Sequence, residues 1–397
     1  MKMFVRVDVF FSPKLICVIT NILYVFIKDN NIKTMKIIQL SYSLASGGGE
    51  RFVVDLCNRL AENHKNEVIL LTTDDDRIPK NVHYLADVSP KVRFINLHCS
   101  SGFAFKSFWG VCRVIRKEKP DVVHAHCNLL LLLLPALFFH RVMFVHTLHN
   151  LAEVCLQFKW MKGLYRWLYR HRIQPITISK TCQQSYINLY GDKRAICITN
   201  GREPFVATGN WPSDVLFLKE SVSPVFIHVA RCNPQKNQPR LFRAFDRLEA
   251  EGVKFHLLVL GLGYEDEWLP RYKNNHYIHI LGVRKNVADY MALADFFVLS
   301  SDFEGLPLSL LEAMSMGVVP VCTPAGGVVD VLENGKNGYC SSSFADDDFY
   351  KSIQQALNER GKLNKDIIKK DYEDNYSMKV CSQKYYNVYE KIVNHEL

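Results

Sequence analysis

The chain has 397 residues, which is long enough for two domains with buried cores. Hydrophobic residues make up 48% of it and charged residues 22%, so disordered, collagen-like and low-complexity chains are excluded. The net charge of +9 is unevenly placed, because residues 1–200 hold 27 Lys/Arg against 14 Asp/Glu, and we expect this half to meet an anionic partner. The twelve cysteines form no C-x-x-C pair, which predicts free thiols in a reducing, cytoplasmic compartment.

Residues 1–34 are expected to lie outside the fold. Residues 15–27 form an uncharged apolar run, which is shorter than the roughly 20 residues that a membrane-spanning helix needs. No small-residue cleavage site follows the run, so a signal peptide is not predicted. Because Met35 opens the first strand pattern, we interpret residues 1–34 as a leader or a mis-assigned start, with a membrane anchor as the alternative.

Short apolar runs alternate with longer amphipathic stretches through the rest of the chain. One series of runs lies at residues 35–40, 67–72, 92–97, 121–126, 142–146 and 175–179. A second series lies at residues 224–230, 254–260, 277–281, 295–299 and 318–322. Strands that alternate with helices form parallel sheets, and uniformly apolar strands are typical of sheets covered on both faces. A further apolar run at 129–139 contains a proline and is interpreted as a buried helix.

The fold class expected from this rhythm is α/β, with two doubly wound Rossmann-like domains in tandem. We place an N-terminal domain at residues 35–200, a C-terminal domain at 201–376 and a final segment at 377–397, with the boundary within 200–223. Ligands of such sheets bind beyond the carboxyl ends of the strands, so the cleft between the domains is the expected site.

The segment after the run at 295–299 has the pattern of an anion site. Pro307 suits the first turn of a helix, which would leave the N–H groups of Leu308 and Ser309 free to bind a phosphate. Glu304 precedes this helix and Glu312 lies about one turn inside it, so their carboxylates can bracket one polyhydroxylated molecule. On spacing alone, a loop charge and an ordinary surface glutamate explain the two carboxylates more simply.

Cations and glycines follow the neighbouring strands. Arg231 and Lys236 come after the run at 224–230, and a planar guanidinium beside an ammonium suits a diphosphate. The next two runs are followed by Gly261, Gly263, Val283 and Arg284. A glycine at a strand end by itself commonly just permits a tight turn.

Taken together, these motifs resemble the GT-B glycosyltransferases of the large retaining group called family 4. The segments HVARCNPQKN, VLGLG and PAGG match that family's nucleotide-sugar domain in order and spacing, with Glu304 and Glu312 as its E-x7-E motif. GGGER at 47–51 matches the family's N-terminal glycine loop. The resemblance covers about residues 35–395 and implies a final helix at 377–393 that returns to the N-terminal domain.

The resemblance also implies roles on the donor side. Arg231 and Lys236 would neutralise the departing diphosphate, while Glu304 would contact the donor hexose. Glu312 corresponds to the family's ribose-binding carboxylate. The other implied donor contacts are Gly48, Gly49, Gly261, Gly263, Val283, Arg284, Gly305, Leu306, Leu308 and Ser309.

Histidines at strand ends complete the expected site. His126 lies nearer the carboxyl end of its strand than His124, and the family often has a histidine there that contacts the transferred sugar or acceptor. His124 is expected to be a core residue. His149 and Asn150 end the next strand and are expected to line the acceptor side.

No metal and no cofactor are expected, because the nucleotide sugar is a substrate and no Cys/His spacing supports a zinc site. The Asp triplets at 74–76 and 346–348 formally match an Asp-x-Asp metal motif. Both stand in polar contexts away from the phosphate cluster, so we interpret them as solvated turn residues.

The segment 159–172 has four cations at helical spacing with aromatic residues between them. This pattern is typical of an interfacial helix on an anionic membrane, and equally of a helix that packs on the sheet with a solvated basic face. Nucleic acid is not expected as a partner, because no nucleic-acid-binding motif accompanies the charge.

The function predicted is retaining transfer of a hexose or N-acetylhexosamine from a nucleotide diphosphate sugar, with UDP expected, to a glycan or lipid-linked glycan acceptor. Biosynthesis of a surface polysaccharide, such as capsule or lipopolysaccharide, is the expected setting. The location would be cytoplasmic, with peripheral attachment at the inner face of the membrane. The alternatives are a nucleotide-sugar epimerase of the same shape and a non-catalytic nucleotide-sugar-binding subunit.

Overall fold

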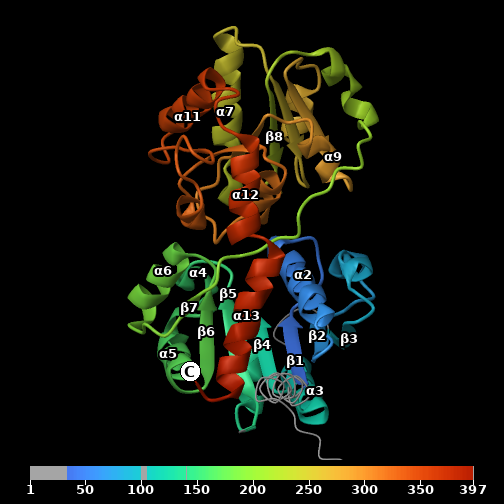
Figure 1. Cartoon of the computed structure of the whole chain (residues 1–397), viewed down its shortest axis with the longest axis vertical. Coiled ribbons are helices and arrows are strands. Elements are labelled where there is room, and N and C mark those ends of the chain that lie inside the picture. The colour runs from blue at the N-terminus through green and yellow to red at the C-terminus, as the bar shows by residue number, and fades with distance from the viewer. Residues whose placement is uncertain (1–33, 100–104, 140, 397) are drawn as a thin grey trace, which may run out of the picture.

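The structure is a computed structural model that describes residues 34–99, 105–139 and 141–396. Two α/β domains stand one above the other (Figure 1), each built around a parallel sheet. The prediction for residues 1–34 falls outside the described residues, apart from Thr34. Within the described part of the chain, no helix is both long and apolar enough to cross a membrane.

The first sheet has seven parallel strands in the order β3-β2-β1-β4-β5-β6-β7. Their bounds are β1 Met35–Ser41, β2 Asn66–Asp74, β3 Arg93–Cys99, β4 Val122–His126, β5 Met143–Leu148, β6 Ile173–Thr177 and β7 Ile196–Cys197. On β1, Ile37 packs in the core on one face and Ile38 in the core on the other. This burial on both faces explains why the strands are largely apolar.

The second sheet has six parallel strands in the order β10-β9-β8-β11-β12-β13. Their bounds are β8 Val225–Val229, β9 His256–Leu260, β10 Ile278–Gly282, β11 Phe296–Leu299, β12 Val319–Cys322 and β13 Tyr339–Cys340. In both sheets the strand order reverses beside the first strand, between β1 and β4 and between β8 and β11. Ligands of doubly wound sheets bind at this reversal.

Helices of the first domain connect these strands. They are α2 Gly48–Glu62, α3 Phe105–Glu118, α4 Ala152–Cys155, α5 Lys162–His171 and α6 Lys180–Tyr190, with 3₁₀ turns η1 Pro79–Val82, η2 Leu85–Asp87, η3 Leu130–Ala136 and η4 Lys159–Met161. The predicted helix at 129–139 is the 3₁₀ segment η3, which contains Pro135. The predicted helix at 159–172 consists of η4 followed by α5.

Helices of the second domain follow the same pattern. They are α7 Gln238–Ala250, α8 Trp268–Tyr272, α9 Val287–Met291, α10 Leu308–Ser315, α11 Asp346–Asn358 and α12 Lys365–Asn375, with η5 Ser213–Glu220, η6 Pro234–Lys236 and η7 Gly326–Asp330. Residues 346–348 form the first turn of α11 and not a loop turn. Acidic residues are favoured there, because the positive end of the helix dipole lies at the N-terminus.

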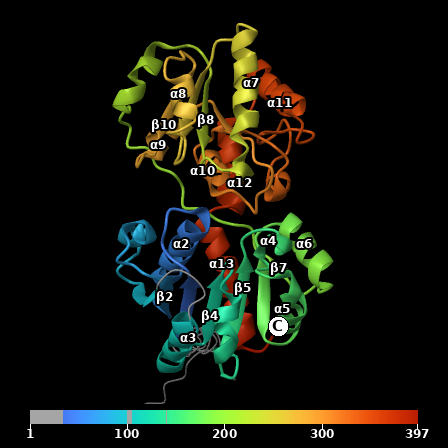
Figure 2. The ribbon, with the colours of Figure 1, turned by 180° about the vertical axis from the view of Figure 1, so that it is seen from behind.

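The last helix, α13 Met378–Val393, leaves the second domain and lies on the first sheet, in front of it in Figure 1 and behind it in Figure 2. The two chain segments that cross between the domains run side by side there. The Arg202 amide donates to the Tyr376 carbonyl at 3.0 Å, and the Met378 amide donates to the Arg202 carbonyl at 2.9 Å. The first domain is therefore completed by residues from the far end of the chain.

Candidate active site

The two domains meet through loops that follow their strands. Gly305, after β11, packs against His149, after β5: a Cβ atom at Gly305 would lie only 2.2 Å from the His149 carbonyl oxygen. At the start of α2, a Cβ atom at Gly48 would lie 3.9 Å from Cγ of Leu308, the first residue of α10. A ligand bound at the strand ends of the second sheet would therefore also meet the first domain.

Lys236 and Glu304 form an ion pair at these strand ends. Lys236 ends η6, and the Asn233 side chain caps that turn by accepting from the Lys236 amide at 3.1 Å. The Lys236 Nζ atom lies 2.5 Å from Glu304 Oε1, and the Ser301 hydroxyl donates to the same oxygen at 2.6 Å. The Glu304 side chain is only 7% exposed, so water screens this pair weakly. The structure thus joins two predicted catalytic residues that are 68 positions apart.

Arg231 acts electrostatically on Glu50 of the other domain. Burial raises the pKa of the Glu50 carboxyl, and a hydrogen bond to its own backbone and the charge of Arg231 lower the pKa in part. A Cβ atom at Gly47 would lie 2.2 Å from Glu50 Oε2, so a glycine at this position leaves room for the carboxylate. Gly48 and Gly49 of this loop are predicted donor contacts, whereas Glu50, inside the same GGGER motif, was assigned no role.

Helix α10 begins at Leu308, one residue later than expected. Pro307 is its N-cap, with φ −70° and ψ 126°. Proline has no side-chain group that can cap a helix, so the amides of Leu308 and Ser309 are available to an anion. The preceding residue, Leu306, is buried, and its carbonyl accepts from the Asn200 amide group at 3.1 Å. This bond fastens the start of α10 to the segment that joins the domains.

Glu312 is bound by Arg202, a residue that belongs to none of the predicted motifs. Its Oε1 atom lies 2.7 Å from Nε of Arg202, whose Nη1 atom lies 2.5 Å from Asp55 Oδ2 on α2. Asp55 also pairs with Arg51 at 2.7 Å. Burial alone would lower the pKa of Arg202, but the charges of Glu312 and Asp55 outweigh it and raise the pKa. The carboxylate expected to bind ribose is therefore tied to the first domain in this state.

His126 lies behind His149 in the first domain. Its ring is 1% exposed, with Nε2 2.7 Å from Gln39 Oε1 and Nδ1 3.0 Å from His149 Nε2. Because the Gln39 oxygen can only accept, His126 carries its proton on Nε2 and accepts from His149 at Nδ1. Both nitrogens of His126 are thus engaged, and the half-buried His149 is the more accessible of the two. Burial lowers the pKa of His149 to about 3, so it is neutral near pH 7.

His124 belongs to the core, bonded to side chains and not to backbone. Its Nδ1 atom lies 2.6 Å from the Tyr389 hydroxyl and its Nε2 atom 2.7 Å from the Thr147 hydroxyl. Thr147 in turn bonds to Tyr385 at 3.1 Å, and Gln39 donates to Tyr389 at 3.0 Å. Two tyrosines of α13 therefore hold the polar residues behind the expected acceptor side.

The other predicted residues are more scattered. Gly261 has φ 144°, and a Cβ atom there would lie 1.9 Å from the Ala230 carbonyl oxygen, so the turn after β9 requires glycine. Arg284 is bonded to Asp214 of η5 at 2.8 Å and to the Tyr290 hydroxyl at 3.0 Å, away from the Lys236–Glu304 pair. Among the remaining predicted site residues, Gly263 has φ 94° and Val283 is exposed. Gly49 lies beside Cys127, and the Asn150 side chain accepts from the Leu151 amide.

Asp74 ends β2 and is buried, so the expectation of a solvated turn residue is wrong for it. Asp75 is ion-paired with Arg77, and Asp76 lies 2.7 Å from His98. The side chains of Asp75, Asp76 and His98 lie close enough together on the surface of the first domain to have the spacing of metal ligands. In the other triplet, Asp346 pairs with Arg243 at 2.6 Å.

Two doubly wound domains with facing strand ends and a returning C-terminal helix define the GT-B class of fold. Residues 46–204 match the family Glycosyltransferase Family 4, and residues 217–374 match the family Glycosyl transferases group 1. The two matches together span most of the chain, which belongs to the GT-B glycosyltransferases of group 1.

Individual relatives are distant. A UDP-Gal:alpha-D-GlcNAc-diphosphoundecaprenol alpha-1,3-galactosyltransferase of Escherichia coli is 28% identical over 262 residues, which are 59% of this chain and 65% of that protein. The chain thus matches just under two thirds of that relative's length. A glycosyltransferase structure from Rickettsia africae has a TM-score of 0.75 at 17% identity, covering 91% of this chain and 98% of that chain. The structure of Anabaena Alr3699/HepE with UDP and glucose has a TM-score of 0.70 at 18% identity, covering 90% and 100%.

Proposed function

We propose that this protein transfers a hexose or N-acetylhexosamine, with retention of configuration and without a metal ion, from a UDP-sugar to a glycan or lipid-linked glycan. The observation that carries the proposal is the shielded Lys236–Glu304 pair near the uncapped start of α10. The setting would be synthesis of a surface polysaccharide. The relative from Escherichia coli uses UDP-Gal and a diphosphoundecaprenol-linked acceptor, which supports this choice of substrates.

Residues on the donor side would neutralise the charge of the departing diphosphate. Negative charge grows on the diphosphate as the anomeric C–O bond breaks, and it needs preorganised positive groups nearby. Lys236, Arg231 and the leading amides of α10 would supply them. Glu304 would hold Lys236 in place and bind hydroxyls of the donor hexose, while Glu312 would exchange Arg202 for the ribose.

Retention is proposed to occur by attack on the same face of the sugar, assisted by the leaving phosphate. Glu304 is already paired with Lys236 and bonded by Ser301, which makes it a poor covalent nucleophile. On the acceptor side, His149 would contact the acceptor, and His126 would hold the His149 ring through its bond at 3.0 Å.

The donor is tested by thermal unfolding of the full chain with UDP-, GDP- and ADP-sugars. A ligand that binds only the native state stabilises it by about 2.7 kcal/mol at a concentration a hundred times its Kd. We expect a rise in Tm with a UDP-sugar and none with the other two. A rise with GDP- or ADP-sugars alone would overturn the choice of UDP.

Catalysis is tested with Lys236→Met, which removes the ammonium and keeps most of the side-chain volume. Loss of one preorganised donor costs about 10²–10³ in kcat, so transfer of labelled sugar should fall by that factor. The matched control is Lys273→Met, an exposed lysine beside α8 that should leave the rate unchanged. Equal rates for the two variants would exclude a catalytic role for Lys236, and full activity in a chelator is expected if no metal takes part.

Location and membrane contact are part of the proposal. The enzyme would work in the cytoplasm, attached to the inner face of the membrane through the basic segment 159–172. Anionic lipids attract clustered Lys and Arg side chains by about 1 kcal/mol each near the surface. Co-sedimentation with phosphatidylglycerol vesicles that is lost at high salt would support this attachment.

A further inference from the structure

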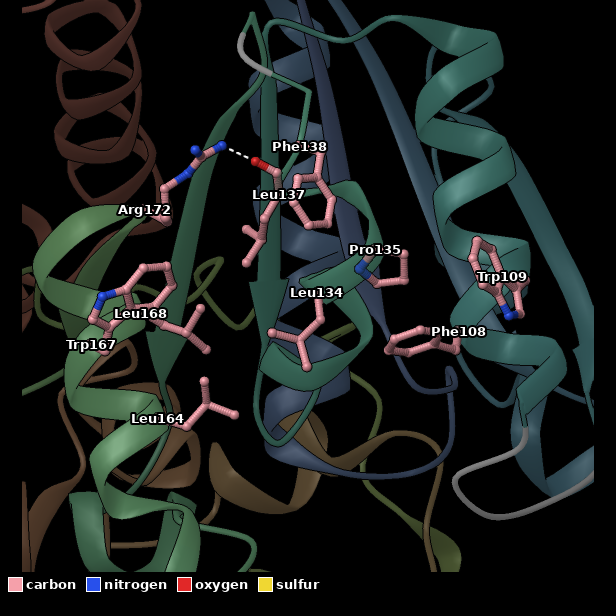
Figure 3. Close-up of a pocket in the computed structure, with 10 residues that line it drawn as sticks. All are labelled: Phe108, Trp109, Leu134, Pro135, Leu137, Phe138, Leu164, Trp167, Leu168 and Arg172. Carbon is pink, nitrogen blue, oxygen red and sulfur yellow. Dashed lines mark hydrogen bonds between the residues drawn. The ribbon is translucent and has the colours of Figure 1, made fainter.

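An apolar groove lies on the first domain between α3, η3 and α5 (Figure 3). It has a volume of about 470 Å³, within the usual range of small-molecule pockets. Leucines and aromatic rings form most of its wall. The lining residues are Phe108, Trp109, Leu134, Pro135, Leu137, Phe138, Leu164, Trp167, Leu168 and Arg172.

Large aromatic side chains of this groove are open to solvent. Trp109 and Trp167 are each 52% exposed and Phe138 is 79% exposed. A contiguous exposed apolar patch on a soluble domain commonly marks a binding surface, because leaving it in water is unfavourable. The groove therefore has the character of a site for an apolar ligand.

The sequence segment that supplies the lining of the groove is strongly basic. Residues 105–172 hold eleven Lys/Arg and three Asp/Glu, so this segment carries most of the chain's net charge. Arg172 lines the groove itself, where its guanidinium donates to the Leu137 carbonyl (Figure 3). An apolar chain attached to an anionic head complements this surface in both respects.

A second, more polar hollow adjoins the groove at the strand ends of the first sheet. It has a volume of about 350 Å³ and is lined by Tyr42, Thr73, Ser107, Cys127, Asn128, Leu129, Leu132 and Gln157. Ser107 of this hollow and Phe108 of the groove are consecutive in α3, and both cavities use residues of η3. At the other side, Cys127 lies against Gly49, where a Cβ atom would be 3.3 Å from its sulfur.

We infer that the groove between α3, η3 and α5 binds the apolar chain of an amphiphilic acceptor, whose sugar head occupies the hollow beside Cys127. The inference rests on the proposed function, since it names the class of acceptor. The hollow offers hydroxyl and amide side chains without a carboxylate, which suits an uncharged sugar.

The test compares two probes with the same head. Farnesyl diphosphate has a long apolar chain, and isopentenyl diphosphate is its short control; binding of both to the full-length protein is measured by equilibrium dialysis. Diphosphate binding by Arg231 and Lys236 contributes equally to both probes, so the difference reports on the chain. Since each buried methylene strengthens binding, farnesyl diphosphate should bind at least about tenfold more tightly.

Three variants test whether the apolar chain of farnesyl diphosphate lies in the groove. Trp167→Ala and Leu134→Arg should each weaken farnesyl diphosphate binding by about tenfold while leaving isopentenyl diphosphate unchanged. Trp160→Ala is the matched control, because Trp160 is 81% exposed in the same basic segment and does not line the groove. Trp167→Ala alters an exposed side chain, so it serves as the decisive variant if Leu134→Arg fails to fold.

Two results would overturn the inference. Equal affinity for both probes would mean that the groove takes no chain, for instance because the apolar run at residues 15–27 fills it. Equal weakening of farnesyl diphosphate binding by Trp160→Ala and Trp167→Ala would mean that exposed aromatic side chains of segment 159–172 hold the apolar chain without the groove. The same proteins are tested for protection by UDP-glucose: protection without chain discrimination rejects the groove alone, and lack of protection by every nucleotide sugar rejects the proposed function.

Discussion

Replacing Arg202 by methionine should destabilise the protein by about 3 kcal/mol, because it leaves buried carboxylates without their partner. The side chains of Arg202, Asp55 and Glu312 are only 9%, 1% and 12% exposed. Breaking a buried ion pair costs about 3–5 kcal/mol, and the lower value applies because Asp55 keeps Arg51 at 2.7 Å. Methionine preserves most of the packing, so the loss in free energy of unfolding reflects the removal of the charge.

The assay is urea unfolding of the full chain, with Arg59→Met as the matched control. Arg59 joins the same helix to the same interdomain segment through Glu203 at 2.6 Å, but these side chains are 28% and 30% exposed. Exposed pairs contribute about 0–1 kcal/mol, so the control should change the free energy of unfolding little. If Arg202→Met costs no more than Arg59→Met, the Asp55–Arg202–Glu312 cluster does not hold the domains together.

Two other predictions concern protonation and packing. Four histidines of the first domain have pKa values lowered by burial, so they stay neutral in the folded protein but charge in the unfolded chain below about pH 6.5. These are His124, His126, His146 and His149. The unfolded state therefore binds more protons as the pH falls, and the free energy of unfolding measured in urea should drop by at least about 2 kcal/mol from pH 7 to pH 5; a flat profile would contradict this. Gly305→Ala should destabilise the protein by about 1–3 kcal/mol in the same assay, because its Cβ atom would lie 2.2 Å from the His149 carbonyl oxygen. Gly163→Ala on α5 has open space around its Cβ atom and should be neutral or slightly stabilising; similar losses for both alanines would show that the domains do not touch closely at Gly305.

Local patterns in the sequence predict most of the fold. All eleven runs of the two series are strands, because burial on both faces of a sheet favours apolar side chains in its strands. The strands β7 and β13 were missed, since two residues are too few to form a pattern. The proximity of Lys236 and Glu304 also follows from local information, because the residues that follow neighbouring parallel strands meet at one edge of the sheet.

Contacts between distant segments could not be predicted in this way. Asp55 stands in an apolar stretch of α2, and its partner Arg202 lies 147 positions away in the segment between the domains. A charged residue on the buried face of a helix signals that a partner exists, but not which one. Likewise, nothing local marks Tyr389 as the partner of Gln39, from which it is 350 positions distant.

The return of α13 also bears on how the protein is made. Tyr385 and Tyr389 are fully buried in the first domain, and they emerge from the ribosome only after the whole second domain has been synthesised. Until then His124 Nδ1 and the Gln39 amide group lack their partner, the Tyr389 hydroxyl, and would remain partly hydrated. The first domain to be translated is therefore the last to be completed.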